Sequence, residues 1–162
     1  MRRTKSHEYL FRAREGKLAG MYRDAYSTAK YPPCPVVRGF RVFSTPLNWE
    51  QTFVEALVDT GSDVSFLPAH LFLSLMNASD ACRRLAIYDQ MEVSGITGKQ
   101  SDVPLFLLQY EIPGLRVKAE AAFLLLGSQA LLGRNILNRY RVILDGILKG
   151  DNEIPTLAIT TV

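Results

Sequence analysis

Short apolar runs separated by turn-forming residues recur along most of the chain and predict a β-rich fold. Residues 36–45 and 52–59 are rich in apolar and β-branched residues and flank a turn at 46–49, so they predict an antiparallel hairpin. Residues 91–93 and 103–108 flank a glycine-containing segment and predict a second hairpin. Further strands are predicted over 117–126, 142–144 and 156–162.

Two stretches favour helix instead. Residues 68–76 are mainly apolar over a helical length and begin with a proline, which the first turn of a helix accepts. Residues 128–140 place leucine and isoleucine at helix-like spacing. We therefore predict an all-β fold with one or two short helices.

The first 31 residues differ from the rest of the chain in charge. They hold eight Lys or Arg against three acids, a balance of +5, which leaves −2 for the remainder of a chain whose net charge is +3. Three prolines at 32, 33 and 35 follow, so we place a boundary between an extension over 1–31, helical or partly disordered, and a domain over 32–162. The simplest interpretation of the extension is a solubilising arm. Recruitment of an acidic partner, or removal as a prosegment near Tyr31, stays open.

Composition excludes several classes of protein. With 162 residues, 48% of them hydrophobic and 22% charged, the chain fits one globular domain. Its two cysteines and two histidines make neither a disulfide framework nor zinc-ligand spacing. No apolar run reaches the roughly 18 residues of a membrane span, and no apolar segment follows the basic start. We expect a cytoplasmic protein without metal, cofactor, membrane or nucleic-acid partner.

Three segments carry the candidate chemistry. In the first, an apolar strand leads a carboxylate into a tight turn, Leu57-Val58-Asp59-Thr60-Gly61-Ser62-Asp63. A glycine-bearing hairpin tip follows, Gly95-Ile96-Thr97-Gly98. The third segment is Leu131-Leu132-Gly133-Arg134-Asn135, two apolar residues and a glycine before a cation.

In this order and separation the three segments resemble those of the retropepsin-like (retroviral-type) aspartic proteases. The resemblance runs from about Val36 to Val162, and the helix expected at 68–76 is closer to the cellular and microbial relatives than to the compact viral ones. It implies a closed β-barrel of the kind that forms half of an acid protease. It also implies an aspartic endopeptidase that hydrolyses protein or peptide substrates.

Peptide hydrolysis without a metal or a covalent intermediate needs one base and one acid. Two neighbouring carboxylates supply both, because like charges so close share a proton. This chain has a single Asp-Thr-Gly, so the resemblance implies a twofold homodimer in which Asp59 meets its symmetry mate. A catalytically silent dimer of the same fold, acting as a peptide-binding or adaptor module, is the alternative.

The resemblance also implies roles for the residues around Asp59. Thr60, Gly61 and Ser62 would support the active-site loop, and Asp63 would contact substrate and pair with Arg134. The tip at 95–98 would be a flap that closes over substrate, although Thr97 stands where retroviral flaps often carry glycine. The flap residues are Gly95, Ile96, Thr97 and Gly98, and the residues that would support the site from below are Leu131, Leu132, Gly133 and Arg134.

Overall fold

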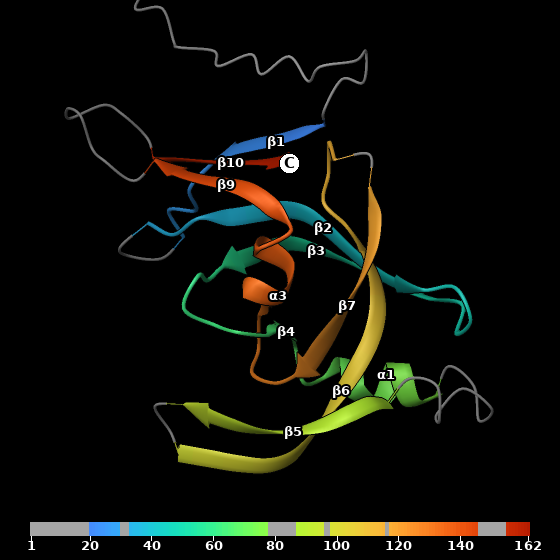
Figure 1. The fold of residues 1–162 in the computed structure, drawn as a ribbon. Coiled ribbons are helices and arrows are strands. Elements are labelled where there is room, and N and C mark those ends of the chain that lie inside the picture. Colours follow the sequence, from blue (N-terminus) through green and yellow to red (C-terminus); the bar gives the residue numbers. More distant parts are fainter. Residues whose placement is uncertain (1–19, 30–32, 78–86, 96–97, 116, 146–154) are drawn as a thin grey trace, which may run out of the picture.

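The computed structural model describes residues 20–29, 33–77, 87–95, 98–115, 117–145 and 155–162, and the account below concerns these residues (Figure 1). Strands make up most of them, together with two short helices. The elements are β1 (Met21–Ala25), β2 (Val36–Ser44), β3 (Trp49–Val58), β4 (Ser65–Leu67), α1 (Leu71–Asn77), β5 (Ile87–Gly95), β6 (Gly98–Glu111), β7 (Lys118–Leu125), β8 (Ala130–Leu132), α3 (Arg134–Leu137), β9 (Tyr140–Asp145) and β10 (Thr156–Thr161).

Six strands form a closed barrel. Their order is β2-β3-β8-β4-β7-β6, and pairing between β2 and β6 closes the ring. Most neighbours are antiparallel, but β3 with β8 and β4 with β7 run parallel. The predicted all-β closed barrel with short helices is confirmed.

Both predicted hairpins are present. Strands β2 and β3 pair antiparallel from Val36 opposite Leu57 to Ser44 opposite Trp49. Strand β5 pairs with the first part of the long strand β6, and the later part of β6 pairs with β7. In Figure 1 the β5–β6 hairpin lies at the end of the molecule away from β1, β9 and β10.

The barrel is filled by side chains that alternate along its strands. Phe40, Tyr110 and Phe123 are fully buried, with ring centroids 6.1 to 6.5 Å apart. These rings come from β2, β6 and β7, strands distant in sequence, so the aromatic cluster joins the walls of the barrel. Neighbouring side chains of a strand point to opposite faces of the sheet, so inward and outward positions alternate.

Helix α1 confirms the prediction over 68–76: Leu71 and Leu75, one turn apart, are its buried residues. The helix predicted over 128–140 is only partly correct. Its first half is strand β8, and helix α3 covers four residues after Gly133. Strand β8 pairs with both β3 and β4 inside the barrel, so those tertiary hydrogen bonds override a local helical spacing.

The described part of the predicted N-terminal extension is a strand rather than a helix. Strand β1 pairs antiparallel with β10, which pairs on its other side with β9. Tyr22 is only 7% exposed, and its partner across the strands, Ile159, is fully buried. The extension therefore contributes a strand to the folded unit, while residues 1–19 lie outside the described residues.

This three-stranded sheet is attached to the barrel by polar contacts. The Tyr22 hydroxyl accepts a hydrogen bond from the Arg38 amide at 2.7 Å, and the Arg38 guanidinium pairs with Asp24 at 2.9 Å. At the other end, the hydroxyls of Tyr110 and Tyr140 are 2.9 Å apart. Within the described ranges, no helix has the length and apolar character that crossing a membrane requires.

Candidate active site

Asp59 begins the loop that joins β3 to β4. Its backbone amide donates to the carbonyl oxygen of Leu132 at 3.0 Å, continuing the parallel pairing of β3 with β8. Its carboxylate Oδ1 accepts the Gly61 amide at 2.8 Å, and the residue is half-buried. A side chain at position 61 would place its Cβ 3.1 Å from that oxygen. The loop therefore holds the Asp59 carboxylate in one orientation, at the end of a strand anchored in the core.

Helix α3 docks on this loop through its first amides. The Arg134 amide donates to the carbonyl of Ser62 at 2.8 Å, and the Asn135 amide donates to the carbonyl of Asp63 at 3.0 Å. The helix has no capping side chain of its own at Gly133. The Asp59 loop thus satisfies amides that a helix start leaves without partners inside the helix.

Gly133 is at the closest contact between the two segments. A Cβ there would lie 2.5 Å from the Val64 carbonyl oxygen and 3.0 Å from the Ser62 oxygen. Only a residue without a side chain allows this approach. Leu132 is fully buried beside it, and Leu131 pairs with Leu57 and with Phe66, so this segment supports the loop from the barrel side.

The expected pairing of Asp63 with Arg134 is present as an ion pair between their side chains. Both side chains are exposed, Asp63 by 77% and Arg134 by 49%. Solvent and salt screen such a pair, so it adds little to stability. Thr60 is exposed at the turn, and the Ser62 hydroxyl donates to the Val64 carbonyl at 2.7 Å within the loop.

The predicted flap is the end of the β5–β6 hairpin. Gly95 and Gly98 are paired across it, and Ile96 and Thr97 between them lie outside the described residues. Gly98 has φ of +115°, a conformation that side-chain-bearing residues rarely adopt. Farther along, Lys99 pairs with Glu92 across the hairpin at 3.0 Å.

Sequence reasoning missed two residues of this region, Ser65 and Asn135. The Ser65 hydroxyl accepts the Gly133 amide at 2.9 Å and donates to Asn135 Oδ1 at 2.8 Å, and Ser65 is fully buried. Asn135 lies in the third segment but received no role. A serine between Val64 and Phe66 in an apolar strand is the signal that could have revealed this contact.

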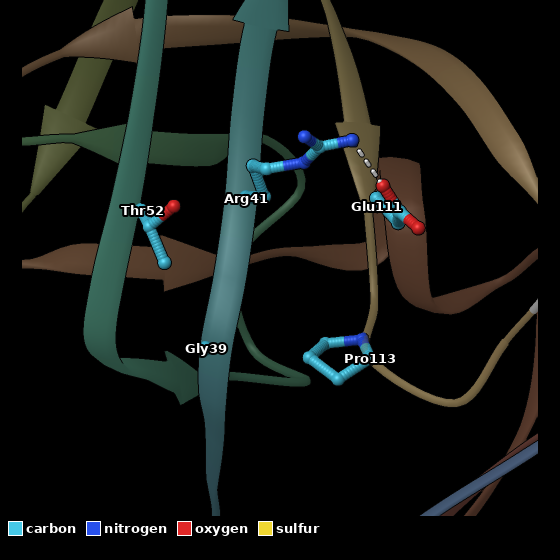
Figure 2. A pocket seen from close by; sticks show the side chains of 5 residues that line it. All are labelled: Gly39, Arg41, Thr52, Glu111 and Pro113. Atoms are coloured by element: carbon cyan, nitrogen blue, oxygen red, sulfur yellow. Dashed lines mark hydrogen bonds and ion pairs between the residues drawn. The ribbon is translucent and has the colours of Figure 1, made fainter.

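The structure has a hollow on the outer side of β2, with a volume of about 370 Å³ (Figure 2). Arg41 spans it to reach Glu111, with nitrogen and oxygen 2.5 Å apart. Asp59 does not line it. Among the described residues, no three His, Cys, Asp or Glu side chains gather where they could hold a metal ion. The residues that line the hollow are Gly39, Arg41, Thr52, Glu111 and Pro113.

Comparison with known proteins finds similarity at the level of structure. No family model and no curated protein matches the sequence. A retropepsin-like aspartic protease from Rickettsia conorii is 12% identical, with a TM-score of 0.43 over 93% of this chain and 100% of the other. The EIAV protease, solved with the inhibitor HBY-793, is 16% identical, with a TM-score of 0.41 over 69% of this chain and 92% of the other. The similarity is one of fold.

Proposed function

We propose that this protein is an aspartic endopeptidase whose active site is formed by Asp59 from two subunits. The observation that supports it most directly is the held carboxylate of Asp59, with Oδ1 bound by the Gly61 amide at 2.8 Å. Its loop is fixed by β8 and α3 rather than by flexible side chains. A hydrolytic site needs such preorganised geometry.

One carboxylate cannot serve as both base and acid, so the proposal requires a second. Asp63, the other acid of the same loop, pairs with Arg134. The symmetry-related Asp59 of a second copy is the remaining candidate. In the shared site, the ionised carboxylate would take a proton from water as the water oxygen attacks the scissile carbonyl. The protonated carboxyl would supply the proton that the departing amine needs as the C–N bond breaks.

Strand β9 offers a surface for that second copy. Among the described strands it pairs only with β10, and Ile143 and Leu144 are 41% and 42% exposed. Because strand edges favour pairing with another chain, we place the second copy along β9.

The substrate in this proposal is an extended peptide between the Asp59 pair and the two hairpins. In this proposal the peptide would make strand-like backbone hydrogen bonds with the end of the β5–β6 hairpin. Asp63 would contact the peptide backbone beside Asp59. Because one proton must remain on the pair, we expect activity to be highest at acidic to mildly acidic pH.

The test compares cleavage of an unfolded protein mixture by the wild-type chain and by Asp59→Asn from about pH 4 to 7, with oligomeric state measured by sedimentation. Cleavage should be lost in Asp59→Asn and retained in Glu120→Gln, a matched carboxylate-to-amide change at an exposed position of β7. Adding excess Asp59→Asn to wild type should also lower activity, because mixed dimers carry one carboxylate.

Two results would contradict the proposal in different ways. Equal turnover by wild type and Asp59→Asn would exclude Asp59 as the catalytic group. If instead neither protein cleaves but the wild type binds peptide, the silent module is favoured. Full activity in a strictly monomeric sample would exclude the shared site.

A further inference from the structure

A chain of hydrogen bonds, buried at Gly133 and part-buried at Asn135, connects the Asp59 loop to the barrel wall. The Gly133 amide donates to the Ser65 hydroxyl, which donates to Asn135 Oδ1; the distances are 2.9 and 2.8 Å. The Asn135 side-chain Nδ2 then donates to the carbonyl of Ala122 on β7 at 2.8 Å. Three strands and a helix start meet at this one chain of bonds, since Ser65 lies on β4 and Gly133 between β8 and α3.

This chain of bonds has little tolerance for change. Ser65 is fully buried and Gly133 is buried, so water cannot replace the hydroxyl as the acceptor for the Gly133 amide without entering the core. A buried donor that loses its partner bears the full cost of desolvation. In the part of the chain that the structure describes, every buried side-chain nitrogen or oxygen has a hydrogen-bond partner.

We infer that Ser65 and Asn135 are positioning residues for Asp59, an inference that rests on the proposed function. The link runs through the backbone: Leu132, whose carbonyl accepts the Asp59 amide, directly precedes Gly133. Loss of the Ser65 hydroxyl frees Gly133 to shift, and the Leu132 carbonyl and the Asp59 amide shift with it. In a twofold site the displacement occurs in both subunits, so the error in the separation of the two carboxylates is doubled.

Asn135 connects the same hydrogen bonds to helix α3. Its backbone amide binds the Asp63 carbonyl at 3.0 Å while its side chain bridges Ser65 and Ala122. Asn135 therefore helps to fix the positions of the Asp59 loop, α3 and β7 relative to one another. Both hydrogen-bonding ends of the amide are used, the oxygen as acceptor and the nitrogen as donor, so neither a carboxylate nor an apolar side chain reproduces it.

The first test is Ser65→Ala, with Ser27→Ala as the matched control. Ser27 is also buried, at 3% exposure, and its hydroxyl donates to the Glu55 carboxylate at 2.9 Å rather than to a group of the Asp59 loop, Gly133 or Asn135. Ser65→Ala should lower kcat about tenfold or more with KM changed little, because misplacement of a reacting group affects the chemical step. Ser27→Ala should retain the wild-type kcat. Both are assayed well below their unfolding temperatures.

A second readout does not depend on proteolysis. The Gly61 amide is bound to the Asp59 carboxylate, so its NMR signal reports the geometry and ionisation of that group. In Ser65→Ala the chemical shift of the Gly61 amide should change and the Gly133 amide should lose exchange protection; in Ser27→Ala neither should change. An unaltered Gly61 signal in Ser65→Ala overturns the inference even if the protein proves not to be a protease.

Asn135→Asp supplies a nearly isosteric variant with a pH signature. The ionised carboxylate cannot donate to the Ala122 carbonyl, whereas the protonated acid can. Relative to wild type, kcat should be reduced near neutral pH and recover toward acidic pH. A constant ratio of the two activities across pH 4 to 7 would contradict a positioning role for Asn135. If wild type itself is inactive, the proposed function fails and the Gly61 readout alone decides the inference.

Discussion

Asp63 and Arg134 are separated by 71 positions in the sequence and form an ion pair at the edge of the Asp59 loop. The backbone amides of Arg134 and Asn135 bind the same loop, so the side-chain pair adds to a contact that the main chain already makes. Because both side chains are exposed, we expect the pair to contribute more to peptide binding in the proposed site than to the stability of the fold.

Replacing Arg134 by alanine should therefore affect binding more than stability. We expect the free energy of unfolding to change by less than about 1 kcal/mol, as for other exposed pairs. KM for a peptide substrate should rise, because Asp63 loses the partner that orients it. Urea unfolding and steady-state kinetics measure the two quantities. Arg41→Ala, which breaks ion pairs with Glu50 and Glu111 outside the loop, should leave KM unchanged; an equal rise in both variants would contradict the role of Arg134.

Gly133→Ala should be strongly destabilising. The added Cβ would lie 2.5 Å from the Val64 carbonyl oxygen, a backbone atom that can move only with the loop. We expect a loss of about 1–3 kcal/mol in the free energy of unfolding, together with loss of cleavage. Gly127→Ala is the control: its Cβ meets nothing within 4 Å, so only its positive φ of 72° is penalised. If Gly133→Ala is as stable as wild type, the Val64 backbone can move away from the added Cβ at little cost, and the prediction is wrong.

Removal of residues 1–19 and removal of residues 1–31 should have different consequences. The longer deletion strips β1 from β10, exposes the buried residues Leu157 and Ile159, and leaves Arg38 without Asp24. We expect the shorter variant to retain a cooperative thermal transition and the longer one to lose it or to melt at a markedly lower temperature, as measured by circular dichroism. If the longer variant melts like wild type, β1 is dispensable and a prosegment ending near Tyr31 becomes tenable again.

Stability at alkaline pH should depend on Tyr22. Burial raises the pKa of Tyr22 to about 12, despite the opposing hydrogen bond from the Arg38 amide. The unfolded chain loses this proton near pH 10, before the folded protein does. The stabilisation is therefore complete below pH 10 and is lost as the pH rises through about 12.

The corresponding measurement is the free energy of unfolding between pH 9 and 12 for wild type and Tyr22→Phe. The wild-type value should fall by up to about 1.4 kcal/mol per pH unit more steeply than that of the variant. At neutral pH, Tyr22→Phe should be less stable by about 1–3 kcal/mol, because the part-buried Arg38 amide loses its acceptor. If the free energy of unfolding depends on pH in the same way for both proteins, Tyr22 does not contribute to the loss of stability at alkaline pH.

Local patterns predicted the elements whose stability is mostly local. The β2–β3 hairpin follows from two runs of apolar and β-branched residues around a turn, and helix α1 follows from a proline-led apolar run; both appear near their predicted bounds. These predictions succeeded because neighbours in the chain make the contacts.

Elements stabilised from a distance were missed. Residues 130–132 have helix-like spacing, yet form a strand because β3 and β4 flank them in the barrel. Residues 21–25 were assigned to a basic arm and instead pair with β10, whose sequence position is more than 130 residues away. The net charge of residues 1–31 does not reveal that the edge of β10 accepts residues 21–25 as a neighbouring strand.

By itself, the sequence determined that the chain is β-rich and that it carries a single Asp-Thr-Gly, the feature on which the proposed two-subunit active site rests. Only the tertiary structure decided how the Asp59 loop is held. Ser65 and Asn135 are ordinary polar residues in the sequence, 70 positions apart. Burial in the barrel removes water as their partner, so they bond to each other and to the backbone beneath Asp59. Hydrogen bonds of this kind depend on which groups lose solvent together, and only the folded chain determines that.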